Sequence, residues 1–262
     1  MKQIYITCSS LAKYTGHNTY EPVEKVVEEL LIKNNLKVGK IPTSNVEREI
    51  LELPEKQVQK LKTDLKLPET SDISEITKAV KRIVRPSIHS ETEDKSREAI
   101  DANVMKVESQ VLQSLIPSIQ KDVRMSRGCK RETQNLDTIQ TQQGIQITER
   151  NSQMYVGELY RCEDYVIIIR GKVDGQSDDT IIESKNRTKR LFKVLRGYEQ
   201  VQLESYMFLT GLRKALLTEH YNETHHCIEY SHDEEFWREC VANMVEFMET
   251  YVRPALPETT TC

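Results

Sequence analysis

Residues 171–185 read GKVDGQSDDTIIESK, which predicts two β-strand segments joined by a polar turn. Alternate side chains of a strand point to the same face of a sheet, so Glu183 and Lys185 should project together while Ser184 points away. Asp174 ends the first segment and can meet them across the hairpin. An ordinary surface ion pair at the end of a hairpin would have the same spacing, so both interpretations stay open on this stretch alone.

Two carboxylates that converge on one point are suited to a hard divalent cation such as Mg²⁺, which prefers oxygen ligands and keeps several of its waters. We expect Mn²⁺ to substitute for it, because carboxylates also suit that ion. A lysine beside the cation can orient the attacking water and offset the charge of a phosphoryl transition state. Asp174, Glu183 and Lys185 are therefore candidate catalytic residues for phosphodiester hydrolysis.

The segments around this stretch predict a layered core of the α/β (α+β) class over residues 126–262. The run at 166–169 is β-branched and apolar enough for a buried strand. Periodicity predicts further strands at 144–150, 153–160, 213–221 and 225–231, and helices at 197–210 and 236–252. This order favours a central mixed sheet flanked by helices.

Residues 1–125 predict an almost entirely helical region that precedes the core and packs on it. Ser44 and Glu47 have the spacing of a capping box, which opens a short helix. Apolar residues at helical spacing predict two further helices, at 73–84 and 100–115. The chain is thus expected to divide after residue 125.

Composition places the chain among soluble proteins, with 37% hydrophobic and 30% charged residues. It has no run of about 18 apolar residues, and its start lacks the apolar stretch of a secretory signal. We therefore expect no membrane contact and a place inside the cell, in the cytoplasm or nucleus of a host or packaged in a virion. The six cysteines form no CxxC pair and are expected to be free thiols.

The net charge of −4 does not mark a nucleic-acid binder, but such binding depends on local patches. Residues 121–131 carry five Lys/Arg against one acid, and residues 185–196 carry six and no acid. The second patch leaves the candidate active-site strand directly. We therefore expect Arg187, Lys189 and Arg190 to contact the phosphate backbone.

Two further features of the sequence complete a recognisable set. Gln202 and Tyr206 lie four residues apart on a predicted helix, hence on one face, and Glu132 lies on a predicted helix ahead of the first strand. Together with GKVD and ESK, these residues resemble the RecB-type PD-(D/E)XK nucleases, most of all the branch of YqaJ viral recombinases and phage lambda exonuclease. The segment ITCSSLAKYTGHNTY near the start is similar to the opening of YqaJ-type proteins.

The resemblance implies a restriction-endonuclease-like core and a metal site. It assigns Asp174 and Glu183 as ligands of the catalytic metal, helped by the backbone carbonyl of Ser184. It also implies that Glu132 reaches the same metal or a second one. Lys185 would position the nucleophilic water.

The resemblance further assigns residues around the metal. Gln202 and Tyr206 would brace the site and the phosphate strand. Ser9 falls where lambda-type enzymes contact a 5′-phosphate. The basic residue that these enzymes carry shortly before that serine is absent, since only Lys2 is available, and Arg127 could take its place; a solvated arginine at a helix start is the alternative.

The function that follows is a Mg²⁺-dependent DNA exonuclease that acts on linear duplex ends in recombination or repair of a virus, phage or other mobile element. The resemblance implies a single-strand annealing protein as a partner and a homo-oligomer, in particular a trimer. A structure- or sequence-specific endonuclease on the same core is one alternative. A non-catalytic nucleic-acid-binding or virion protein is another. The cluster of histidines at 220–232 fits no closed zinc site, and we expect no metal there.

Overall fold

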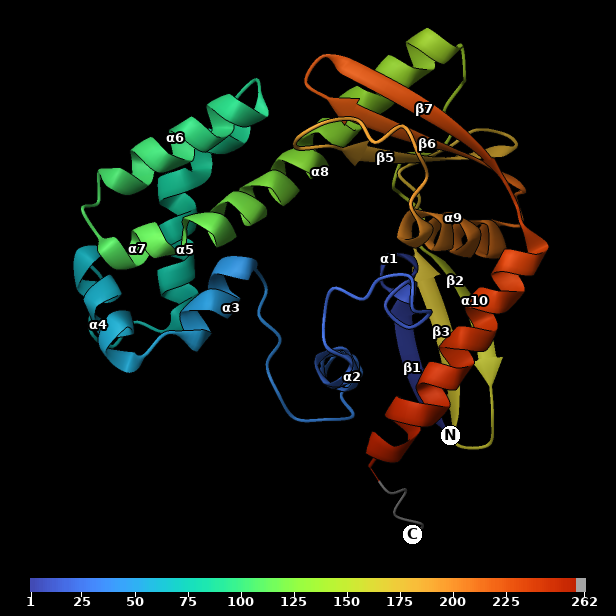
Figure 1. Cartoon of the computed structure of the whole chain (residues 1–262), viewed down its shortest axis with the longest axis horizontal. Helices are drawn as coiled ribbons and strands as arrows, with labels where there is room; N and C mark the ends of the chain where they lie inside the picture. Colours follow the sequence, from blue (N-terminus) through green and yellow to red (C-terminus); the bar gives the residue numbers. More distant parts are fainter. Residues whose placement is uncertain (258–262) are drawn as a thin grey trace. The chain divides into compact units, whose positions relative to one another are not determined.

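The computed structural model describes residues 1–257 and divides the chain into two compact units (Figure 1). The core unit comprises Met1–Ile41, Thr133–His220 and residues 225–257. The helical unit comprises Pro42–Glu132 and Tyr221–Thr224. The division therefore differs from the expected one at residue 125, because the first 41 residues belong with the core.

The first sheet of the core unit explains this difference. It has the order β1-β3-β2, built from β1 (Lys2–Thr7), β2 (Tyr155–Arg161) and β3 (Tyr165–Gly171). The expectation that the chain starts with helices is wrong here, because β1 pairs in parallel with β3, with Ile4 opposite Ile167. The outer edge of β1 is covered at one point by Asn34, whose side chain accepts from the Tyr5 N–H at 2.6 Å and donates to the Tyr5 carbonyl at 3.1 Å.

The second sheet carries the candidate site and has the order β4-β5-β6-β7. Its strands are β4 (Gly175–Gln176), β5 (Thr180–Asn186), β6 (Lys214–Tyr221) and β7 (Thr224–Ser231). Strands β5 and β6 are parallel, since the chain crosses between them through a helix. The expected α/β class is confirmed, with the strands divided between two sheets. The predicted strand at 144–150 forms only an isolated bridge between Glu149 and Gln176.

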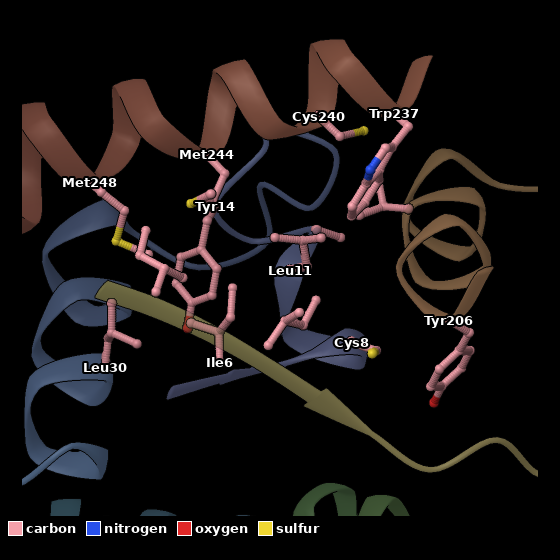
Figure 2. Packing of buried hydrophobic residues seen from close by; sticks show 14 of the residues in the cluster. Ile6, Cys8, Leu11, Tyr14, Leu30, Tyr206, Trp237, Cys240, Met244 and Met248 are labelled. Carbon is pink, nitrogen blue, oxygen red and sulfur yellow. The ribbon is translucent and has the colours of Figure 1, made fainter. Parts of the chain in front are cut away.

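Helix α9 (Gly197–Thr210) is that crossover, and it contacts strands of both sheets as well as α1 (Cys8–Leu11). Its residues from Val201 to Met207 are all buried, as expected of a helix enclosed by the rest of its unit. Helix α10 (Glu234–Phe247) closes the hydrophobic core of this unit. Figure 2 shows Trp237, Cys240 and Met244 on the face of α10 that is turned toward Leu11 and Tyr14.

The helical unit has its own hydrophobic core, separate from that of the core unit. Ser44 caps α3 by accepting from the Glu47 N–H at 3.2 Å, so the predicted helix start is confirmed. The single long helix expected over 100–115 is wrong: Glu108 has a φ of 55°, a left-handed conformation that an α-helix cannot contain, and Ser109 caps a new helix. The helices of this unit are α3 (Asn45–Glu52), α4 (Glu55–Asp64), α5 (Ile73–Val84), η1 (Arg85–His89), α6 (Glu93–Met105) and α7 (Gln110–Ser114).

The remaining helices are α2 (Val23–Lys33), the long α8 (Ile116–Gln143), η2 (Met248–Val252) and η3 (Arg253–Ala255). Helix α8 carries Pro117 in its first turn, where a missing N–H costs no helical hydrogen bond. The boundary between the two units falls within α8. Over residues 1–257, no helix combines the length and apolar character that crossing a bilayer requires.

Candidate active site

The candidate site begins where β4 meets β5. Gly175 pairs with Ile182 in an antiparallel register, which brings the preceding residue, Asp174, beside the end of β5. The Asp174 carboxylate accepts a hydrogen bond from the backbone N–H of Ser184 at 2.8 Å (Oδ2–N). Within a sheet the N–H and C=O of one residue face the same neighbour, so the Ser184 carbonyl also faces the edge from which Asp174 comes. The hairpin expected from the sequence thus carries Asp174 to β5.

Glu183, Lys185 and Gln202 form one hydrogen-bonded cluster across β5 and α9. The ammonium of Lys185 donates to Glu183 Oε1 at 2.6 Å and to Gln202 Oε1 at 2.9 Å. The amide of Gln202 donates in turn to Glu183 Oε1 at 3.0 Å and to the Tyr206 hydroxyl at 3.1 Å. Glu183 and Lys185 therefore project to the same face of β5, as their spacing predicts, and the helix pair Gln202 and Tyr206 meets them there.

The second carboxylate oxygen of Glu183 is left free by the hydrogen bonds of this cluster. Glu183 Oε2 is buried and, within residues 1–257, accepts no hydrogen bond. An unpaired charged oxygen in a buried position is costly, so it calls for a cation or an ordered water. Because Asp174 reaches the same strand end and both groups are hard oxygen donors, the residues present fit a divalent cation such as Mg²⁺ or Mn²⁺.

The Glu183 carboxylate of this cluster is buried, whereas the Lys185 amine is partly accessible to solvent. The Glu183 side chain is 5% exposed, whereas that of Lys185 is 24% exposed. Burial acts to lower the pKa of Lys185, but the negative charges of Glu183, Asp174 and Glu199 outweigh it and raise that pKa above its ordinary value. Lys185 is therefore protonated at neutral pH and can donate to a bound anion.

The wall of the site is formed where α1 and α9 approach the end of β3. A side-chain carbon added at Gly171 would lie 2.5 Å from Cys8 Sγ and 2.7 Å from Tyr206 Cε1, so only glycine allows this approach. Burial, assisted by the charge of Glu183, raises the pKa of Cys8 to about 12 and also raises that of Tyr206. Both side chains are thus neutral at physiological pH, and Cys8 is not a thiolate nucleophile.

Ser9 follows Cys8 at the surface of the core unit. Its side chain is exposed, and its hydroxyl lies 3.2 Å from that of Thr7. Ser9 is thus one residue away from the wall formed by Cys8. Its contact with a terminal phosphate stays a prediction.

Arg187 does not line the surface, contrary to the expected phosphate contact. Its side chain is 9% exposed, and Nη1 lies 2.7 Å from the Glu199 carboxylate. Its Nε donates to the Glu219 carboxylate at 2.6 Å, and the guanidinium stacks on Phe192 with 4.2 Å to the ring centroid. Two buried carboxylates hold the arginine inward, so its assignment as a phosphate contact is wrong. By contrast, Lys189 and Arg190 are exposed, and their contact with phosphate stays a prediction.

Arg127 is also buried, at 2% exposure within the helical unit. Its Nε donates to Glu93 at 3.2 Å and its Nη1 to the Ser90 carbonyl at 2.6 Å. Desolvation lowers the pKa of its guanidinium. Neither a phosphate contact nor a solvated arginine fits this environment, so both expectations for Arg127 are wrong.

Glu132 is the last α8 residue assigned to the helical unit, and its role as a metal ligand stays a prediction. Over residues 1–257, no three His, Cys, Asp or Glu side chains gather as a ready-made metal site. A cation bound by Asp174 and Glu183 would thus keep open positions for water and substrate, as Mg²⁺ commonly does.

Three further residues around the site were not among the predicted ones. Asn135 on α8 donates to the Ser184 hydroxyl at 3.2 Å and to Asn186 Oδ1 at 3.1 Å, which ties that helix to β5. Glu199 and Glu219 hold Arg187, as described above. The location of Glu199 three residues before Gln202 on the same helix could have indicated that it faces β5.

Comparisons with known proteins give a distant likeness of structure. No protein-family model matches the chain, and no curated protein is significantly similar to it. The alkaline exonuclease LHK-Exo from Laribacter hongkongensis is 13% identical with a TM-score of 0.37, over 67% of this chain and 89% of the exonuclease.

Two other solved structures show a likeness of the same order. LHK-Exo in complex with dAMP is 15% identical, with a TM-score of 0.35 over 50% of this chain and 71% of that one. The protein SSO0001 is 14% identical, with a TM-score of 0.40 over 69% of this chain and 88% of that one. Because similarity this low says nothing about activity, the function rests on the geometry of the site.

Proposed function

We propose that this chain is a metal-dependent nuclease that hydrolyses phosphodiester bonds in DNA. The observation that carries the proposal is Glu183: Lys185 and Gln202 hold one of its carboxylate oxygens, and the other is buried without a partner. A divalent cation held between this oxygen and the Asp174 carboxylate, which reaches the same end of β5, would compensate the desolvation of Glu183.

The residues of the cluster divide the chemistry between them. Asp174 and Glu183 would hold Mg²⁺, which when bound polarises the phosphoryl group and acidifies an attacking water. Lys185, protonated, donates a hydrogen bond to that water or to a phosphoryl oxygen as negative charge develops. Gln202 fixes the direction of the lysine ammonium through its 2.9 Å hydrogen bond, and Tyr206 holds the amide of Gln202.

We further propose that the enzyme acts as an exonuclease on linear duplex DNA. An enzyme that digests from an end must hold a free terminus. Ser9 is an exposed hydroxyl next to the site wall, and Lys189 and Arg190 are exposed cations on the loop that leaves β5. The sequence resemblance supports this mode, together with a role in viral or phage-type recombination, a single-strand annealing partner and a trimeric assembly.

Incubation of the full chain with end-labelled linear duplex and with covalently closed circular DNA, with and without Mg²⁺, tests both levels of the proposal. We expect Mg²⁺-dependent release of short products from linear DNA while closed circles survive. Cleavage of circles at the same rate would replace the exonuclease by an endonuclease and leave the metal site intact. If neither substrate is cut with Mg²⁺ or Mn²⁺, the chain is a non-catalytic protein and the proposal fails.

A further inference from the structure

The helical unit contains a groove that the proposed nuclease function does not use. It has a volume of about 580 Å³ and lies between α5 and η1 on one side and α8 on the other. Its floor is aliphatic, formed by the buried or half-buried side chains of Val46, Val80, Val84, Ile88, Ile119 and Val123. An apolar recess of this size on a separately packed unit is a typical binding surface for an apolar ligand or side chain.

The rim of this groove is strongly basic. Its charged residues are Lys78, Lys81, Arg82, Arg85 and Lys130, all of them exposed. Among the residues that the structure describes, none of these five forms an ion pair with a carboxylate; Lys130 contacts only the ring of His89, at 3.2 Å. Arg127, which lies on α8 with Lys130, is different because Glu93 compensates its charge.

The single acidic residue that lines the groove is already engaged. The carboxylate of Asp122 accepts from the N–H and side-chain amide of Asn45, at 2.8 and 2.7 Å, and from the N–H of Val46 at 3.1 Å. Asp122 thereby caps the start of α3 and neutralises little of the positive charge of the rim residues. The groove therefore combines an apolar floor with an uncompensated positive rim.

We propose that this groove binds an acidic peptide segment with apolar side chains, presented by a partner protein. Apolar side chains of such a segment would fill the floor, and its carboxylates would face the rim cations, as when an amphipathic helix lies in a groove. Long basic side chains suit this arrangement because their aliphatic stems extend the apolar surface while their charges stay in water. A nucleic-acid backbone would satisfy the rim but leave the aliphatic floor without a partner, so peptide is the better match.

The test uses the full chain and a fluorescein-labelled helical peptide in which leucines recur every three or four residues and glutamates occupy the other positions. Binding is followed by fluorescence anisotropy, so the result does not depend on nuclease activity. Two comparison peptides replace either every glutamate by glutamine or every leucine by serine. We expect the Glu/Leu peptide to bind, the glutamine peptide to bind more weakly and the serine peptide not to bind.

One variant tests the space above the apolar floor, a second tests the basic rim, and a third is the control. Ser126→Trp places a large side chain at an exposed lining position whose hydroxyl bonds only a carbonyl of its own helix, so it should abolish binding without unfolding the unit. Lys81→Glu/Arg85→Glu should weaken binding by about tenfold and reduce its salt dependence. Lys56→Glu/Lys60→Glu makes the same charge change at exposed α4 positions outside the groove and should leave binding unchanged.

Equal binding of the Glu/Leu peptide by the wild type and the Ser126→Trp variant would overturn the proposal, as would absence of binding. A labelled DNA duplex is the third probe. If Ser126→Trp lowers the affinity for this duplex while the wild type binds none of the peptides, the groove belongs to nucleic acid and the peptide proposal is wrong.

Discussion

Arg187, the residue directly after β5, and Glu199 on α9 form an ion pair shielded from solvent, with 2.7 Å between Nη1 and Oε1. The pair ties the end of β5 to the helix that carries Gln202, because Arg187 follows Lys185 by two residues and Glu199 precedes Gln202 by three. Glu219 on the neighbouring strand β6 completes the network. Arg187 is therefore a positioning residue that fixes the spacing between β5 and α9.

Replacing Arg187 by Gln should destabilise the chain strongly, because it leaves the two buried carboxylates of Glu199 and Glu219 without a cation. We expect the free energy of unfolding to fall by about 3 kcal/mol. Arg187→Lys should restore little of this, since a single ammonium cannot span both carboxylates as the guanidinium does. Urea unfolding followed by circular dichroism measures the change. Lys189→Gln, two residues away and exposed, is the control; an equal effect in both variants would contradict the buried network.

Glu183→Gln and Asp174→Asn should each abolish Mg²⁺-dependent cleavage, by about a thousandfold or more, because each removes an anionic ligand. Binding of DNA without metal should persist or strengthen, since repulsion of phosphate is reduced. Single-turnover cleavage of end-labelled duplex gives the rate, and anisotropy gives the affinity. Asp178→Asn, an exposed carboxylate on the adjoining turn, should retain wild-type activity. Full activity in the Glu183 or Asp174 variant would rule out the assigned metal site.

Gln202→Ala should lower kcat by about a hundredfold with little change in KM, since a small displacement of the lysine ammonium is costly to a positioned reaction. The cause is the loss of the 2.9 Å hydrogen bond that orients Lys185. Tyr206→Phe removes only the hydroxyl that accepts from Gln202 and should have a smaller effect in the same direction. Steady-state kinetics on linear duplex separate the two constants. A rise in KM with unchanged kcat would instead assign Gln202 to substrate binding.

Lys189→Ala/Arg190→Ala should weaken DNA binding. The slope of log Kd against the logarithm of the salt concentration should fall by about two, because two phosphate contacts are removed. Single-turnover cleavage at saturating DNA should stay close to wild type, because neither residue contacts the catalytic cluster. Titrations at several salt concentrations measure the slope. Lys56→Ala/Lys60→Ala removes two exposed charges from α4 and serves as the control. An unchanged slope in the first variant would show that this loop does not contact phosphate.

Local rules were enough to predict the centre of the site. The two-residue period of a strand places Glu183 and Lys185 on one face, and the four-residue spacing on a helix does the same for Gln202 and Tyr206. The structure brings these four side chains into one hydrogen-bonded cluster. Such features depend only on backbone geometry within a single element, and a sequence contains that information.

These local rules could not predict which strands pair when the strands are far apart in the sequence. Strand β1 lies beside β3, with Lys2 opposite Tyr165, and this long-range pairing draws the first residues into the core unit. The break at Glu108 was also missed, because apolar spacing on its two sides fits one continuous helix while the backbone takes a positive φ between them.

The sequence by itself determined which residues could share a face and carry chemistry; only the tertiary structure decided which charges reach the surface. Arg187 and Arg127 lie in basic runs that are typical of phosphate contacts, yet the side chain of Arg187 is only 9% exposed and Arg127 is buried. Their carboxylate partners come from segments 12 to 34 residues away, as Glu199, Glu219 and Glu93 do. A buried arginine requires such a partner because desolvating an unpaired charge is too costly, and the partner is present only after the chain has folded.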